Sequence, residues 1–363
     1  MITPDFFELD FLDVETKDSG DAIALRYCVH GATKIHVVDG GYEETGERLV
    51  ELIARYYGAN IFVDNVVVTH QDGDHTKGLE ILLRSFPIGR LWMHRPWIYA
   101  DGLLPYFKHY DSGQALRSVL RRRYANIARL EELAVLLNIA ISEPFQGATI
   151  GAFTVTAPTP TRYFELLIQS DKTPVPVPGF NAQRSIGDIL IEEARRRGQS
   201  AGWGAENPSS EGQSCENEMS VVQFGNLCGR KILLTGDVGV AGLIETHQFC
   251  RANRMMVEPG IDYFQVPHHG GRRNWNPAIL DCLLGAKLPL PPNNATKFCA
   301  IVSSAKADRD HPRKATVRAM IHRGGRVLTT EGSALRIQNS APARPYGEYG
   351  PATILPYPST QET

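Results

Sequence analysis

The segment between residues 61 and 83 constrains the fold of this chain more than any other. Ile61–Thr69 is rich in valine, which is typical of a strand buried on both faces of a sheet. A polar run, His70–His75, follows at once, and leucines and isoleucine with helical spacing come next, with Thr76 as the expected helix cap. This order predicts an α/β fold with polar side chains at the carboxyl end of a strand, where such folds place their sites.

The polar run HQDGDH, which begins at His70, brings two histidines and two aspartates into one short loop. A lone DGD is more often a solvated turn, but burying two histidines and two carboxylates together is costly unless a cation offsets the loss of water. Because Gly73 permits a tight bend, His70 and Asp72 can face one cation while Asp74 and His75 face another. The run therefore predicts a site for two divalent metal ions.

Two later predicted strands also end in candidate ligands. Asp237 follows the strand that ends at Thr235, and His268 and His269 follow the strand that ends at Val266. Each signal alone is more often an ordinary turn. Their succession after the first polar run indicates one site assembled from three strand ends.

The rest of the chain alternates between strand-like and helical stretches. A hairpin is expected over residues 6–14 and 21–29, because turn residues separate two β-type segments. Helices are expected over residues 43–57 and 115–138. Further strands are expected at 35–38, 91–94, 149–157, 219–224, 230–234, 263–266, 298–302, 326–329 and 334–337.

We expect one domain over residues 1–340, with a helical stretch at 95–140 and a loop-rich insertion at 158–215. The insertion is rich in proline, glycine and serine, which is typical of long loops. Residues 341–363 form a tail rich in proline and tyrosine that is expected to be extended, either packed on the surface or left free.

Composition excludes several classes of protein. A chain of 363 residues that is 42% hydrophobic and 21% charged can bury a large core, and a net charge of -2 argues against a generally basic nucleic-acid coat. The six cysteines are scattered and read as reduced thiols, and the N-terminus is acidic where a signal peptide is basic. We expect a cytoplasmic protein that does not associate with membranes.

The succession of motifs resembles the metallo-β-lactamase superfamily. Between about residues 9 and 337, VVDGG, VVVTHQDGDHTKGLE, NEMSVV, ILLTGD, VPHHGG and SSAKADRDHP resemble the soluble hydrolase domain of ComEC-type DNA-uptake proteins. The resemblance implies a four-layer αβ/βα sandwich, with two sheets between helices. HxDxDH is a variant of the commoner HxHxDH, with Asp72 in place of the second histidine. Membrane-spanning helices of the uptake protein have no counterpart here, so translocation of DNA is not implied.

The resemblance also implies which residues bind metal. The implied ligands are His70 and Asp72 for the first ion, Asp74, His75 and His268 for the second, and Asp237 as the bridge between them. The superfamily usually has one more histidine before the bridging aspartate, whereas the corresponding stretch here, Asn217–Ser220, has none. Water or a substrate oxygen would then complete the coordination of the first ion. Oxygen-rich ligation makes Mn²⁺ a candidate beside Zn²⁺.

The implied reaction is hydrolysis of a phosphodiester, with DNA as a candidate substrate. Two cations suit this reaction because they activate water and neutralise charge on phosphorus. Asp74 would also accept a proton, His269 would orient a ligand or donate a proton, and His311 would bind phosphate or protonate the leaving oxygen. Two alternatives stay open: a hydrolase of a small molecule such as a cyclic nucleotide, a phosphorylcholine ester or a lactone, and a metal-binding regulatory protein without turnover.

Overall fold

The computed structural model describes residues 4–107, 109–173, 202–256, 258–292, 296–344 and 349–362. The part of the expected insertion between residues 174 and 201 lies outside the described residues. Before it, the expected loop is a helix, α7 (Pro160–Gln169). Thr159 accepts a hydrogen bond from the backbone N–H of Arg162, and proline occupies the first helical turn, where its missing N–H costs nothing.

The first sheet contains seven strands in the order β14-β1-β2-β3-β4-β5-β6. From β3 to β6 the neighbours are parallel, and the other pairs are antiparallel. The strands are β1 (Phe6–Phe11), β2 (Ala22–Val29), β3 (Ala32–Gly40), β4 (Val63–Val67), β5 (Ile88–Trp92), β6 (Ala140–Ser142) and β14 (Leu335–Asn339).

The second sheet contains eight strands in the order β15-β13-β12-β11-β10-β9-β8-β7. Its centre, β10 to β13, is parallel, and both flanks are antiparallel. The strands are β7 (Thr149–Ile150), β8 (Phe153–Ala157), β9 (Val222–Leu227), β10 (Arg230–Leu234), β11 (Tyr263–Gln265), β12 (Phe298–Val302), β13 (Gly325–Thr329) and β15 (Thr353–Ile354).

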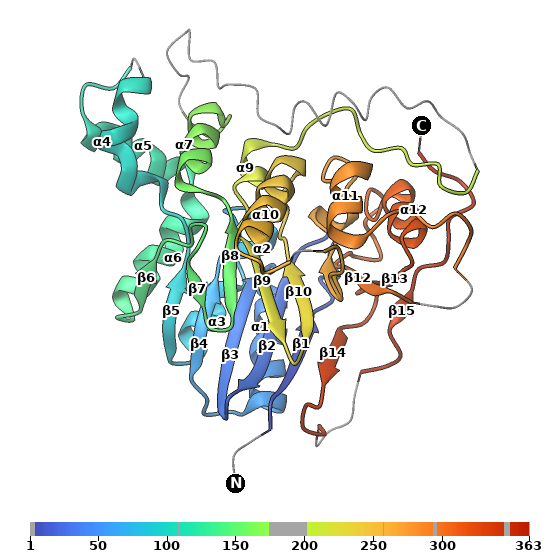
Figure 1. The fold of residues 1–363 in the computed structure, drawn as a ribbon. Helices are drawn as coiled ribbons and strands as arrows, with labels where there is room; N and C mark the ends of the chain where they lie inside the picture. The colour runs from blue at the N-terminus through green and yellow to red at the C-terminus, as the bar shows by residue number, and fades with distance from the viewer. Residues whose placement is uncertain are drawn as a thin grey trace.

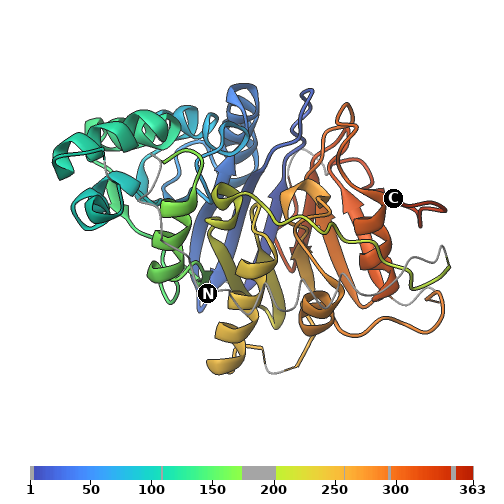
Figure 2. The same cartoon turned by 90° about the horizontal axis from the view of Figure 1, so that it is seen from above.

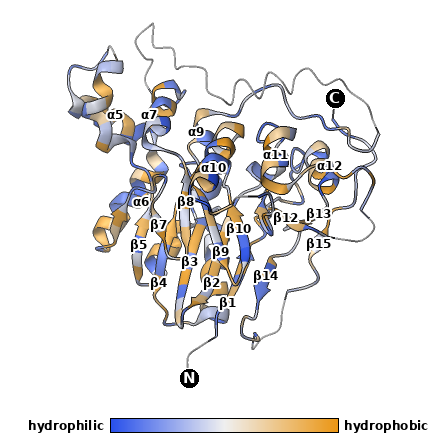
Figure 3. Ribbon diagram, in the orientation of Figure 1, coloured by the Kyte–Doolittle hydropathy of each residue, from blue (hydrophilic) through white to orange (hydrophobic). Residues whose placement is uncertain are grey.

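The two sheets pack face to face between helices (Figures 1 and 2). One apolar cluster joins their inner faces, with Phe7 and Leu25 from the first sheet and Val155 and Leu234 from the second. In Figure 3 the hydrophobic colour lies on strands of both sheets and on the helices that cover them. The first sheet's outer face packs against α1 (Glu43–Leu52), α3 (Leu79–Ser85) and α6 (Ala125–Leu136), and the second sheet's against α10 (Val240–Ala252), α11 (Pro277–Leu284) and α12 (Lys314–His322). The predicted four-layer αβ/βα sandwich is confirmed.

Eight further helical segments occur in the described residues, and all of them except α5 have five residues or fewer. They are η1 (Ile53–Tyr57), α2 (Gly73–Thr76), η2 (Pro96–Tyr99), α4 (Ala100–Leu103), η3 (Leu104–Tyr106), α5 (Gly113–Arg123), α9 (Cys215–Glu218) and η4 (His268–Gly270). Within the described residues, none of the helices is both long and apolar enough to cross a membrane.

Two helix predictions differ from the structure. The helix expected over 115–138 is interrupted at Tyr124, whose backbone leaves the helical region (φ -103, ψ 48), so α5 and α6 are separate. Thr76 does not cap a helix. It lies inside α2, and its hydroxyl donates to the carbonyl oxygen of Asp72 at 2.9 Å, while the next helix begins at Leu79.

The described part of the C-terminal tail packs on the surface. β15 pairs with β13, and the buried guanidinium of Arg344 donates to Glu8 and Asp10 of β1. The hydroxyl of Tyr357 lies 3.0 Å from Nε2 of His322 on α12. The division of the chain into a domain over 1–340 and a separate tail stays a prediction.

The sheet topology explains why a site forms at one edge. In the first sheet β3, β4 and β5 are parallel, and in the second β10, β11 and β12 are parallel. Parallel neighbours end at the same edge of a sheet, and both sets of carboxyl ends lie beneath the helices at the top of Figure 1. The loops that follow these strands therefore meet between the two sheets.

Candidate metal centre

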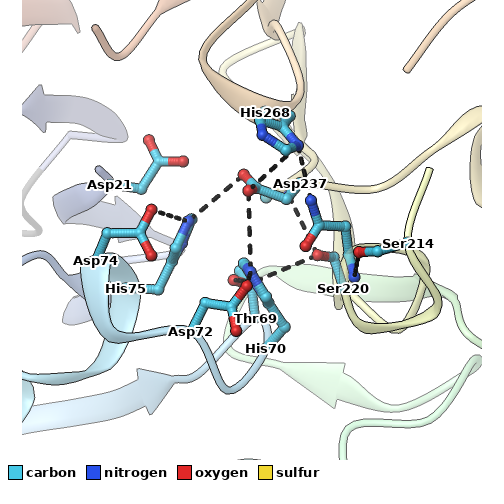
Figure 4. Close-up of polar contacts among 12 residues, drawn as sticks. Asp21, Thr69, His70, Asp72, Asp74, His75, Ser214, Ser220, Asp237 and His268 are labelled. Atoms are coloured by element: carbon cyan, nitrogen blue, oxygen red, sulfur yellow. Dashed lines mark hydrogen bonds and ion pairs between the residues drawn. The ribbon is translucent and has the colours of Figure 1, made fainter. Parts of the chain in front are cut away.

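Acidic and imidazole side chains from both sheets gather at this edge (Figure 4). They come from the loop before β2, the end of β3, the loop after β4 with α2, and the loops after β10 and β11. The residues are Asp21, Asp39, His70, Asp72, Asp74, His75, Asp237, His268 and His269. The structure thus brings together the predicted residues of all three strand ends and adds Asp21 and Asp39.

Asp237 lies at the centre of the group and is buried. Its Oδ1 is 3.5 Å from Nε2 of His75 and 3.9 Å from Nε2 of His269. Its Oδ2 is 3.8 Å from Nε2 of His70 and 3.7 Å from Nδ1 of His268. Since each carboxylate oxygen faces its own pair of imidazoles, Asp237 has the geometry of a bridge between two halves of a site.

We call the half around Oδ1 the Asp74 side; it contains Asp21, Asp74, His75, Asp237 and His269. Asp21, His75, Asp237 and His269 each offer a ligand atom, and these atoms lie within 4.8 Å of one another. Oδ2 of Asp74 is 3.5 Å from Nε2 of both His75 and His269. Carboxylate oxygens and imidazole nitrogens at this spacing form a donor set that a divalent cation can use.

We call the other half the Asp72 side; it contains His70, Asp72, Asp237 and His268. Oδ2 of Asp72 is 3.6 Å from Nε2 of His70, while Oδ1 of Asp72 pairs with Nζ of Lys172 at 2.6 Å. His268 and His269 therefore fall on opposite sides of Asp237, and it is His269 that lies beside Asp74 and His75. The ligand roles implied by the resemblance stay predictions.

Two side-chain amide groups donate hydrogen bonds to the imidazole of His268. The side-chain nitrogen of Asn217 lies 2.7 Å from Nδ1 of His268 and donates to it, and Gln213 makes the same contact. Asn217 belongs to the stretch in which a further histidine was missing from the sequence. Its amide thus contacts a candidate ligand instead of supplying one.

Hydrogen bonds hold the Nδ1 atoms of two imidazoles, His75 and His269, on the side that faces away from the site. Nδ1 of His75 donates to Oδ2 of Asp39 at 2.7 Å, and Asp39 also accepts from the backbone N–H of Thr69 at 2.8 Å. Nδ1 of His269 donates to the carbonyl oxygen of Ser303 at 2.9 Å. With Nδ1 protonated in this way, Nε2 of both rings presents a lone pair to the site, as in metal-binding histidines.

The atoms that face the site are buried and lack hydrogen-bond partners among the described residues. They are Nε2 of His70, His75 and His269 and Oδ1 of Asp237. Burying such atoms without a partner is costly, and buried polar groups in proteins are nearly always satisfied. A cation bound at their centre would satisfy them, so the residues present fit a metal ion.

The charges at the site explain its pKa shifts. Burial opposes protonation of His75, but Asp237, Asp74 and Asp39 outweigh it and raise the pKa of His75 well above its usual value. Burial also opposes protonation of His269, but Asp237 and Asp74 outweigh it and raise the pKa of His269 to about 9. Such high pKa values reflect an excess of negative charge that a bound cation would equally neutralise.

Backbone strain marks the same loops. His268 and His269 have φ of 50° and 53°, and Asp39 has φ of 56°. This left-handed region is uncommon for residues other than glycine, and such conformations cluster at functional sites. The two consecutive positive φ values turn the chain so that neighbouring imidazoles point to opposite sides of Asp237.

His311 lies at the rim of the site. Its ring stacks on that of His268, with centroids 5.2 Å apart, and its Nδ1 lies 3.1 Å from Oδ2 of Asp308. Both His311 and His268 line a cavity of about 680 Å³ that opens beside the metal centre. The structure thus places the predicted proton donor at the boundary between the metal centre and this cavity.

Replacement of Gly20 tests how closely the loop before β2 approaches the site. A Cβ atom at Gly20 would lie 2.7 Å from the carbonyl oxygen of Asp74, which also accepts from the backbone N–H of Asp21 at 3.2 Å. Gly20→Ala should therefore separate Asp21 from Asp74, lowering metal affinity about tenfold and the free energy of unfolding by about 1–3 kcal/mol. Calorimetric metal titration and denaturant unfolding measure both.

The matched control is Gly102→Ala in α4, where the added Cβ would meet no atom within 4 Å outside its chain neighbours and its own helix. It should leave metal affinity unchanged and, as a helical glycine replaced by alanine, be neutral or stabilising. Equal metal affinity in the two variants would contradict the close approach of the Gly20 loop.

Comparisons with known proteins add little to this picture. No protein-family model and no curated protein matches the sequence. One solved structure that resembles the chain is a protein from Thermotoga maritima described as a candidate metallo-β-lactamase, with a TM-score of 0.30 and 11% sequence identity, over 64% of this chain and 78% of that chain.

Proposed function

We propose that this protein is a metal-dependent hydrolase that cleaves phosphodiesters. The observation that carries the proposal is the convergence on Asp237, from both sides, of buried imidazole atoms that have no hydrogen-bond partner among the described residues. Single buried atoms without a hydrogen-bond partner also occur elsewhere in the described residues, at His36 and His94 for example, but at the site Nε2 of His70, His75 and His269 all lie within 3.9 Å of the Asp237 carboxylate. Such a set is what a hydrolytic metal centre requires.

The proposed cation sites are unequal. On the Asp74 side, Asp74, His75, Asp237 and His269 would hold a cation, with Asp21 as a further donor. On the Asp72 side, Lys172 already neutralises Asp72 and Asn217 already engages His268, so a second cation would bind more weakly. This assignment exchanges the roles that the resemblance implies for His268 and His269.

Divalent cations at these residues would lower the pKa of a water molecule and neutralise negative charge on the substrate. The protein's own residues would orient the metal ligands and protonate the leaving oxygen. Asp39 and Ser303 fix the rings of His75 and His269, so that the ligand atoms are preorganised. An anionic substrate beside His311 favours its protonated form, which can then donate a proton to the leaving oxygen while Asp308 holds the ring.

The proposal is tested by elemental analysis followed by assays of the metal-loaded protein. The substrates are bis(p-nitrophenyl) phosphate, single-stranded DNA, a cyclic nucleotide, a phosphorylcholine ester and a lactone, each with Zn²⁺ and with Mn²⁺. We expect bound metal and hydrolysis of the phosphodiesters. Turnover of the lactone alone would replace the proposal with a different hydrolase, and stoichiometric metal without any turnover would indicate the regulatory alternative. Protein without metal affinity would overturn it.

A further inference from the structure

The cavity beside the metal centre has the lining of an anion site. About 680 Å³ in volume, it lies between His268 and His311 on one side and the segment 207–213 on the other. Arg272, Arg273 and Arg313 contribute to its wall, against the carboxylates of Glu211 and Asp310. Pockets of about 300–1,000 Å³ accommodate small organic ligands, so this cavity has room for one or two nucleotides of a strand and is too small for a duplex.

Hydrogen bonds connect the wall of the cavity to the metal centre. Asn274 is fully buried and donates to the carbonyl oxygens of Asp237 and Val238 at 3.0 Å each. Gln213 donates to Asn274 at 3.1 Å, and the backbone of Ser209 donates to the carbonyl oxygen of Arg272 at 3.0 Å. These bonds fix the loop that carries Arg272 and Asn274, the 207–213 segment and the backbone at Asp237 relative to one another.

The guanidinium groups of Arg273 and Arg313 form ion pairs that are exposed to solvent. Arg273 pairs with Glu211, at side-chain exposures of 54% and 66%, and Arg313 pairs with Asp310 at 2.9 Å, at exposures of 37% and 72%. Exposed ion pairs of this kind contribute little to stability. A phosphate, which guanidinium binds through two parallel hydrogen bonds, can therefore take the place of either carboxylate.

We propose that this cavity binds the phosphate next to the scissile one in a single-stranded nucleic acid, through Arg273 and Arg313. The inference rests on the proposed function, because the metal centre would hold the phosphate that is cleaved. A small diester ends at the metal centre, whereas a strand carries its next negative charge past His311 into the cavity. Glu211 and Asp310 then act as competing anions that lower affinity until the strand displaces them.

The test uses the full-length protein and a fluorescent single-stranded oligonucleotide, with the metal chelated so that no cleavage occurs. Arg273→Gln and Arg313→Gln should each weaken binding about tenfold and reduce the slope of log affinity against log salt by about one, as loss of one phosphate contact requires. Glu211→Gln should tighten binding, because it removes the competing carboxylate. Arg230→Gln is the matched control, since Arg230 forms a similar exposed pair with Asp262 at the start of β10.

Activity of the metal-loaded protein supplies a second readout. In Arg273→Gln, the ratio of kcat/KM for the oligonucleotide to that for bis(p-nitrophenyl) phosphate should fall about tenfold. Binding and salt slopes equal to those of Arg230→Gln would overturn the inference, as would equal weakening by Arg273→Gln and Glu211→Gln, which a purely structural ion pair predicts. Failure of the wild type to hydrolyse any phosphodiester would instead overturn the proposed function.

Discussion

Asp237→Asn should abolish most of the metal content and reduce kcat/KM for a phosphodiester by at least about 1,000-fold, or about 4 kcal/mol. Asp237 is the residue whose two oxygens face imidazoles on both sides of the site, at 3.5 to 3.9 Å. Asparagine keeps the shape of the side chain and the hydrogen bond from the backbone N–H to Ser220, but it removes the charge that both cations would share. Elemental analysis and steady-state kinetics measure the two effects.

The matched control for this change is Asp64→Asn. Asp64 also accepts hydrogen bonds, from Nζ of Lys34 at 2.7 Å and the backbone N–H of Ile35 at 2.9 Å, but it lies at the start of β4, away from the site. It should keep full metal content and activity. If Asp237→Asn retained stoichiometric metal and more than about a tenth of wild-type activity, the bridging role of Asp237 would be refuted.

The sequence predicted the framework of the site because the signal was local there. The valine-rich strand before His70 and the strands before Asp237 and His268 are each continuous in sequence, and candidate ligands follow each of them directly. The four-layer fold followed from resemblance and is confirmed. The local signal was misleading at α7. This helix was expected to be a loop because prolines surround its start.

What the sequence did not predict depends on long-range contacts. Asp21 and Asp39 are single carboxylates without a characteristic spacing, and they reach the site only because β2 and β3 pair beside β4. The stretch VVDGG, which contains Asp39, points to the site only through the resemblance to a known family. The divergence of His268 and His269 requires two consecutive residues with positive φ, a conformation that their residue types do not indicate.

Arg344→Met should lower the free energy of unfolding by about 3–5 kcal/mol, which is the usual cost of removing one partner from a buried ion pair. Arg344 is buried and donates to Glu8 at 2.9 Å and to Asp10 at 2.5 Å, both of which are fully buried on β1. Glu8 keeps its ion pairs with Arg26 and Arg336 in this variant, whereas Asp10 loses its ion pair with Arg344. Denaturant unfolding measures the loss, with the exposed Arg84→Met on α3 as a control expected to change little.

The loss should also depend on pH. Burial raises the pKa of Asp10 in the folded protein above its unfolded value, and Arg344 opposes that shift. Without Arg344 the folded pKa rises further, so the folded state binds a proton more readily than the unfolded chain does. The destabilisation is therefore fully present above the folded pKa of Asp10 and shrinks as the pH falls through it. A deficit that is equal at pH 8 and pH 5, or one that grows on acidification, would show that the unpaired carboxylate is not its cause.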